Sequence, residues 1–140
     1  MQFTKKDILD MESLSAEEIS LILDNAESMK EISSRPIKKV PTLRGKTVAL
    51  CFLAPDVSVR CSFDVAAQRL SADHTLVSQT DCSHLQYSAV SRLVAYLEHL
   101  RTDIIVIRHP HAGVPSALAQ RLKTSVINAG DGNHAHPCRT

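Results

Sequence analysis

Two short apolar runs constrain the fold of this chain most strongly. The first reads Thr-Val-Ala-Leu-Cys-Phe-Leu at 47–53, and the second reads Asp-Ile-Ile-Val-Ile at 103–107. Short, continuously apolar runs are typical of strands that are buried on both faces of a parallel sheet. Weaker strand patterns at 72–78 and 125–128 bring the expected number of strands to four. The chain is therefore predicted to build around a parallel sheet.

Helical patterns separate these strands. Ser15 and Glu18 form a capping box that opens a helix over 15–33. Apolar stripes predict further helices after the first strand, over 88–102 and over 115–122, whereas the polar stretch 79–87 is predicted to be a loop. Alternating strands and helices favour an α/β fold of three layers, a four-stranded parallel sheet flanked by helices. Residues 1–140 are expected to form a single domain.

Ligands of such sheets bind beyond the carboxyl ends of the strands. Three loops are expected there, at 54–61, 108–113 and 129–139, and the stretch 129–132 is predicted to be a glycine-rich turn. The basic side chains in these loops are Arg60, Arg108, His109, His134, His136 and Arg139. The first loop leads into a helix, whose positive dipole end attracts anions. It nevertheless carries Asp56, Val57 and Val59, with Arg60 as its single cation.

Arg108 follows directly after a predicted strand. A cation is costly to hold near a core unless an anion or a carboxylate meets it. One interpretation is therefore an anionic ligand, and the other is a salt bridge, for example to Asp131 or Asp103. The sequence leaves both interpretations open.

Composition excludes several classes of function. The net charge of +1 and the aromatic content of 4% argue against a nucleic-acid surface. No apolar run reaches the roughly 20 residues of a membrane span, so no membrane partner is expected. The N-terminal residues lack the apolar core of a signal peptide, which makes a cytoplasmic location the expectation. The four cysteines form no CxxC pair and predict no disulfide framework.

The alternative site motifs are weak. His134, His136 and Cys138 resemble half of a zinc cluster, but closed zinc sites need four well-spaced ligands, so polar loop histidines and no metal are expected. The Gly130-Asp131-Gly132 turn lacks the spacing of a dinucleotide fingerprint, so no cofactor is expected. Cys61 and Cys82 are interpreted as small thiols, because no base can be assigned to either of them.

Four segments together resemble one family. They are 40–48, 62–70, 107–115 and 126–137, and they look like the amino-terminal half of aspartate carbamoyltransferase. The Asn-Ala-Gly-Asp-Gly and Arg-His-Pro sequences favour the aspartate enzyme over the ornithine enzyme. The resemblance implies a domain that binds carbamoyl phosphate, within a catalytic trimer whose active sites lie between subunits. It also implies an aspartate-binding second domain, which is expected to be absent from this chain.

The resemblance assigns roles to particular residues. Arg108 matches the arginine that binds carbamoyl phosphate, and His136 matches the histidine that polarises the carbamoyl oxygen, so both are candidate catalytic residues. The substrate-binding candidates are Ser58, Arg60, Arg108, His136 and Arg139. Cys82 and Gln86 fall where the family has a serine and a lysine that are lent to the neighbouring subunit.

The phosphate loop departs from the family pattern. The family reads Ser-Thr-Arg-Thr-Arg, whereas residues 56–60 read Asp-Val-Ser-Val-Arg. Carbamoyl transfer passes through an oxyanion and releases phosphate, and each missing charged contact costs about 2–4 kcal/mol of transition-state stabilisation. A carboxylate at 56 adds repulsion of about 4 kcal/mol toward an anion ~4 Å away.

These departures lead to the hypothesis of a degenerate carbamoyltransferase domain with a structural or assembly role. It would bind carbamoyl phosphate or phosphate only weakly. It would form a homo-oligomer, as a trimer, or join another carbamoyltransferase or pyrimidine-pathway chain. One rival is a fragment of an active enzyme in which Arg139 replaces the lost loop arginine. Another is an anion sensor that uses Arg60, Arg108 and His136.

Overall fold

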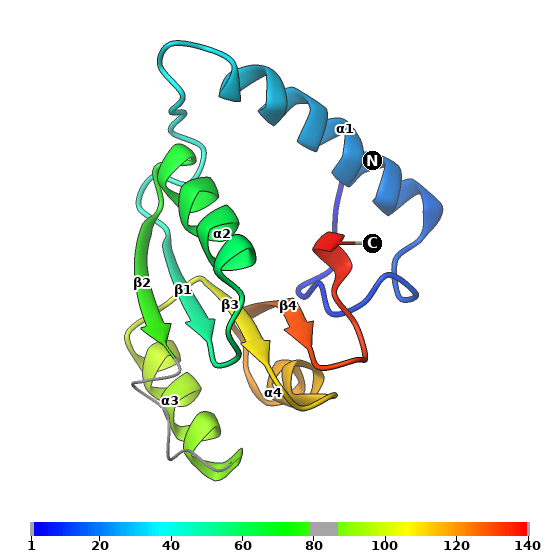
Figure 1. Cartoon of the computed structure of the whole chain (residues 1–140), viewed down its shortest axis with the longest axis vertical. Coiled ribbons are helices and arrows are strands. Elements are labelled where there is room, and N and C mark those ends of the chain that lie inside the picture. Colours follow the sequence, from blue (N-terminus) through cyan, green and yellow to red (C-terminus); the bar gives the residue numbers. More distant parts are fainter. Residues whose placement is uncertain (1, 79–86, 140) are drawn as a thin grey trace.

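The four predicted strands form one parallel sheet. A computed structural model describes residues 2–78 and 87–139. The strands are β1 (Thr47–Phe52), β2 (Asp73–Ser78), β3 (Ile104–His109) and β4 (Ser125–Asp131), in the order β2-β1-β3-β4 (Figure 1). All three pairings are parallel, which confirms the sheet expected from the alternating pattern.

Helices cover both faces of the sheet, which gives the predicted three layers. The helices are α1 (Ala16–Ser33), α2 (Val57–Arg69), α3 (Tyr87–His99), α4 (Val114–Arg121) and the short 3-10 helix η2 (Pro137–Arg139). Val59 and Ala67 of α2 pack with Leu50 on one face. On the other face, Val94 of α3 and Leu118 of α4 pack in a second cluster with Ile105 of β3. The sheet is therefore buried on both sides, as its apolar strands require.

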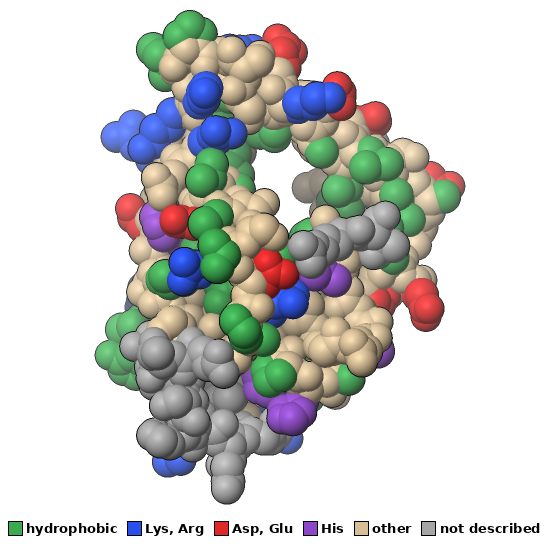
Figure 2. Space-filling view, in the orientation of Figure 1, with side chains coloured by type: hydrophobic (Ala, Val, Ile, Leu, Met, Phe, Trp, Pro, Cys, Tyr) green, Lys and Arg blue, Asp and Glu red, His purple; other side chains and the backbone are tan. Residues whose placement is uncertain are grey.

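Helix α1 stands apart from this core. Ser15 and Glu18 form the predicted capping box. None of the apolar residues of α1 is fully buried, and Leu23 is 62% exposed. Figure 2 shows an opening between α1 and the rest of the molecule, and apolar grooves border it. In the part of the chain that the structure describes, no helix is both long and apolar enough to span a bilayer.

The N-terminal segment closes the outer edge of β4. Ile8 forms a parallel bridge with Ile127. The Ile8 amide donates to the Val126 carbonyl at 2.9 Å, and the Asn128 amide donates to the Ile8 carbonyl at 2.8 Å. Asp7 adds a side-chain acceptor for the Val126 amide at 2.8 Å. Residues that are more than a hundred positions apart are thus tied together at this edge.

Strand and helix limits differ from the predictions at the carboxyl end of the sheet. β4 runs to Asp131, so the turn predicted at 129–132 is wrong for its first three residues. An irregularity after Ile107 lets His109 pair with Asp131, which extends both strands past their apolar runs. The predicted loop 54–61 is also too long, because α2 begins at Val57. The loop predicted at 79–87 lies mostly outside the described residues.

A candidate anion site at the carboxyl end of the sheet

Asp56 caps helix α2. Its carboxylate Oδ1 accepts from the Val59 amide at 3.1 Å and from the Ser58 hydroxyl at 2.9 Å. Asp is among the best N-cap residues because its carboxylate satisfies an amide that the helix leaves without a partner. The helix therefore starts two residues before Val59, and Asp56 lies where the helix dipole is most positive.

Arg108 lies across from this cap, near the end of β3. Its Nη1 donates to the Ala129 carbonyl at 2.8 Å, and its Nη2 lies 3.6 Å from Oδ2 of Asp56. Both side chains are mostly buried, at 20% and 15% exposure. The salt-bridge interpretation of Arg108 is thus realised, but with a different partner from either predicted one. Asp103 lies 3.7 Å from Lys46 instead, and Asp131 has other partners.

Gly130 makes room for this arginine. Its φ is +120°, a conformation that residues with a side chain rarely adopt. A Cβ atom at this position would overlap Arg108 Nη1 and would lie 3.3 Å from Cδ2 of His136. The guanidinium and the imidazole therefore lie together over the Gly130 backbone. The structure brings together the two residues that were predicted to be catalytic.

Asp131 organises the loop that carries His136. Its side chain is fully buried and accepts from the Gly113 amide at 2.8 Å, the Ala135 amide at 2.8 Å and Asn128 Nδ2 at 3.3 Å. His134 Nδ1 lies 2.9 Å from Asp131 Oδ2, the oxygen that also accepts from the Gly113 amide. Burial acts to raise the pKa of Asp131, but these hydrogen bonds outweigh it and hold the pKa below its ordinary value. The Asp131 carboxylate is therefore charged, and both of its oxygens have hydrogen-bond partners within the fold.

His109 is buried next to this network. The His111 amide donates to its Nδ1 at 3.0 Å, which makes that nitrogen an acceptor in a neutral ring. Burial lowers the pKa of His109, and the neighbouring His111 lowers it further. His109 thus acts as a structural residue at the end of β3.

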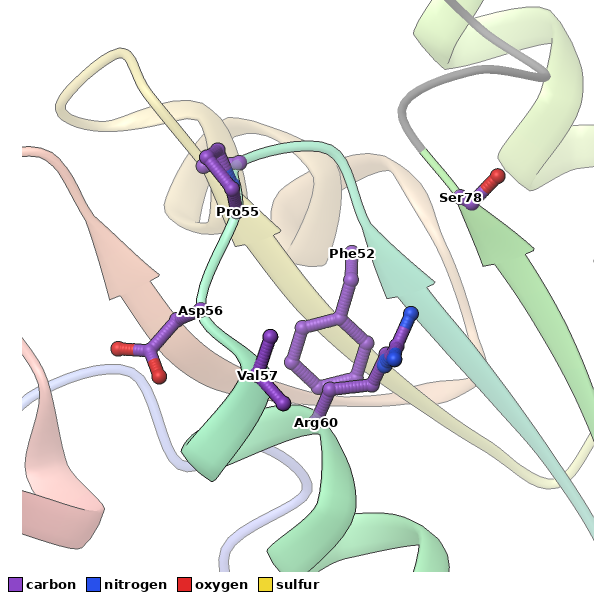
Figure 3. A pocket seen from close by; sticks show the side chains of 7 residues that line it. Phe52, Pro55, Asp56, Val57, Arg60 and Ser78 are labelled. Carbon is purple, nitrogen blue, oxygen red and sulfur yellow. The ribbon is translucent and has the colours of Figure 1, made fainter.

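Arg60 lines a pocket that it shares with Asp56. A pocket of about 200 Å³ lies at the start of α2, and its lining is Phe52, Ala54, Pro55, Asp56, Val57, Arg60 and Ser78. In Figure 3 the Arg60 side chain lies beside the Phe52 ring and points toward Ser78, whereas the Asp56 carboxylate points the opposite way. The structure therefore does not join Arg60 to the Arg108–His136 pair.

The other predicted site residues are Ser58, Arg139, Cys82 and Gln86. Ser58 is exposed, and its hydroxyl donates to Asp56. Arg139 lies in η2, three residues after His136. Cys82 and Gln86, predicted to reach a neighbouring subunit, lie outside the described residues. Among the residues that are described, no group of three or more His, Cys, Asp or Glu side chains is arranged to hold a metal ion.

Sequence reasoning missed the roles of Asp56 and Gly130. A helix-start signal was present for the first, because Asp precedes the apolar positions of α2 at N-cap spacing. Gly130 is recognisable in the sequence only as part of a glycine-rich motif. Its close approach to Arg108 depends on how β3 and β4 pair, which the sequence does not show.

Comparison with known families identifies the domain. Residues 6–140 match the profile of the aspartate/ornithine carbamoyltransferase, carbamoyl-P binding domain. The chain belongs to this family, and within it to the carbamoyl-phosphate-binding domain.

The similar curated proteins are named as aspartate carbamoyltransferase catalytic subunits. The chain is 54% identical over 140 residues to the aspartate carbamoyltransferase catalytic subunit of Desulforapulum autotrophicum, covering all of this chain and 45% of the relative. It is 49% identical over 137 residues to the same subunit of Geobacter sulfurreducens, covering 98% of this chain and 44% of that one. The chain therefore spans less than half the length of the relatives it matches.

Solved structures share the fold. The catalytic subunit of M. jannaschii aspartate transcarbamoylase superimposes with a TM-score of 0.76 at 31% identity, covering 95% of this chain and 43% of that one. Ornithine carbamoyltransferase from Pyrococcus furiosus gives a TM-score of 0.77 at 29% identity, covering 95% and 42%. The family resemblance and the predicted fold class are therefore both confirmed.

Proposed function

We propose that this chain is an aspartate carbamoyltransferase domain of the pyrimidine biosynthesis family that keeps the fold but does not transfer carbamoyl groups. Its role is structural, in assembly with other chains. Arg108 and His136 are the remaining catalytic positions, and Ser58, Arg60 and Arg139 are the remaining substrate-binding ones. Residues 1–140 act in this proposal as one carbamoyl-phosphate-binding-like unit.

The composition of the pocket at the start of α2 supports this proposal. Among the residues that the structure describes, its lining contains one arginine and one carboxylate, and the rest is apolar apart from Ser78. Val57 is 68% exposed where a phosphate loop needs donors. Each donor missing from a developing oxyanion or leaving phosphate costs about 2–4 kcal/mol, so several missing donors together remove most of the rate.

Calorimetry tests the proposal directly. The 140-residue chain is titrated with carbamoyl phosphate and, separately, with a bisubstrate phosphonate. We expect no heat of binding at millimolar ligand. Arg60→Gln serves as a control variant, because it removes the one arginine among the described lining residues and should leave the trace unchanged. Micromolar binding by the wild-type chain, lost in Arg60→Gln, would contradict the proposal.

Mass in solution tests the assembly part. We expect the purified chain to be a trimer, or to join another carbamoyltransferase or pyrimidine-pathway chain when the two are mixed. Light scattering after size-exclusion chromatography distinguishes these outcomes. A monomeric chain that does not bind such chains at micromolar concentration would contradict the assembly role.

A working fragment is the second candidate function. The close placement of Arg108 and His136 over Gly130 favours it, because both matched catalytic positions are held together. Formation of N-carbamoyl-L-aspartate from carbamoyl phosphate and L-aspartate is its assay. Turnover well above buffer that is lost in His136→Ala, and kept in the exposed control His111→Ala, would establish this candidate and exclude the first.

A further inference from the structure

We propose that Asp56 is a tethered anion that occupies the oxyanion position between the start of α2 and Arg108. The position would otherwise take a small oxyanion such as phosphate. This inference rests on the proposed function and deepens it, because it names what fills the site of the inactive domain.

The contacts of Asp56 are those of a bound anion. One carboxylate oxygen takes the Val59 amide and the Ser58 hydroxyl at the positive end of a 13-residue helix. The other faces Arg108 Nη2 at 3.6 Å. A helix amide, a hydroxyl and a guanidinium are the donors with which proteins bind phosphate. Here all three face a carboxylate that belongs to the chain itself.

Arg108 is built into the fold to face this position. Its Nη1 is fixed to the Ala129 carbonyl at 2.8 Å, and Gly130 gives it the space to lie there. Its Nε is buried, and the described residues offer it no hydrogen-bond partner. A guanidinium held in this way needs a counter-anion, since burying an unpaired charge is costly. Asp56 supplies that counter-anion.

The family match agrees with an anion site in this domain. The family profile that matches residues 6–140 is described as a carbamoyl-P binding domain. The same stretch of this chain therefore comes from a fold that receives a phosphorylated ligand. An internal carboxylate that meets the same types of donor competes intramolecularly with any such ligand.

Removing only the charge of Asp56 tests the proposal. Asn at an N-cap accepts the helix amide as well as Asp does, so Asp56→Asn keeps the cap and frees the position. Asp64→Asn is the matched control, because it makes the same charge change on the same helix, at a residue paired with His74 at 2.8 Å. Inorganic phosphate is the probe, followed by calorimetry and by the amide signal of Val59 in NMR.

We expect Asp56→Asn to bind phosphate at least about tenfold more tightly than both the wild type and Asp64→Asn, because a like charge has left the position. Adding Arg108→Gln to Asp56→Asn should abolish the gain. Equal affinities in Asp56→Asn and Asp64→Asn would overturn the proposal, as would a gain that survives Arg108→Gln.

Two further readouts keep the outcome decisive. Circular dichroism checks folding, and Asp56→Ser is a second capped variant without the charge. If neither capped variant folds, the proposal is also overturned, because both caps suffice for the helix. The proposed function is judged separately, by carbamoyl transfer in the wild-type chain, whereas this inference is judged by the ratio of phosphate affinities between variants.

Discussion

Two aspartates hold the two loops at the carboxyl end of the sheet, and they do so in different ways. Asp131 is fully buried, and backbone amides, Asn128 and His134 surround it. Asp56 lies at the start of α2, and its partners are the first turn of that helix and Arg108. Asp131 thus fixes the conformation of the loop that carries His136, whereas Asp56 occupies the proposed anion position between α2 and Arg108.

The largest effect should come from the buried member of the pair. Asp131→Ala leaves two backbone amides without an acceptor, and such losses cost about 1–3 kcal/mol each. We therefore expect about 3–5 kcal/mol of destabilisation, measured as the free energy of unfolding in urea. Asp131→Asn should lose less, because it keeps an acceptor. A loss in Asp131→Ala below that in Asp56→Ala would reverse the comparison.

Gly130 links the two aspartates through Arg108. A Cβ at this position overlaps Arg108 Nη1, and φ is +120°. Gly130→Ala should therefore destabilise the fold by about 2–4 kcal/mol, from backbone strain and from displacement of the arginine. Gly45→Ala is the control, since φ there is +80° but nothing lies within 4 Å. Equal losses at both glycines would show that displacement of Arg108 costs nothing.

The pH dependence of stability should follow the Asp131 side of the comparison. The pKa values of Asp131 and His109 are both lowered in the folded state. A lowered pKa gives stability that is fully present above the unfolded value and is lost as pH falls through the folded value. Stability should thus begin to fall below about pH 6.5, where His109 becomes protonated in the unfolded chain but stays neutral in the folded one. It should fall again below about pH 4, where Asp131 becomes protonated in the unfolded chain first.

Urea midpoints measured between neutral and acidic pH check this prediction. Each unit by which a pKa is lowered contributes about 1.4 kcal/mol. In His109→Asn the first decline should be missing, while the second should remain. A stability that is flat from neutral pH into the acid range would contradict the assignment of both groups.

The smallest effect should come from Asp56. Asp56→Ala removes both the cap of α2 and the counter-anion of Arg108, and should cost about 2 kcal/mol. Asp56→Asn keeps the cap but removes the counter-anion, so it should cost about 1 kcal/mol. Thermal unfolding followed by circular dichroism measures both. An unchanged stability in Asp56→Asn would mean that the charge of Asp56 does not stabilise Arg108.

Much of the fold was predictable because burial leaves a pattern in the sequence. The apolar runs at 47–53 and 103–107 became β1 and β3, and the capping box at Ser15 and Glu18 opened α1. The ends of β3 and β4 were not predictable, because polar residues such as His109 and Asp131 pair there through an irregular register. Local patterns do not encode that register.

The candidate site was predictable in part. Arg108 and His136 followed from the resemblance, and the structure places them together over Gly130. The partner of Arg108 was mispredicted, because Asp56 lies 52 residues away in the chain and joins it only through the order of β1 and β3. A contact between residues so far apart in the sequence depends on how the strands pack, and the local sequence pattern does not reveal it.

The bridge at Ile8 limits how copies of this chain can associate. Its hydrogen bonds pair Ile8 with the outer edge of β4 at Val126 and Asn128. Among the described residues, β2 at the opposite end of the sheet is then the edge strand that is open to pairing. A sheet that continues through many copies of a chain needs an unpaired edge strand at both ends of each copy. Backbone pairing through β2 would therefore stop at two molecules, and a ring of three has to be held by side-chain surfaces instead.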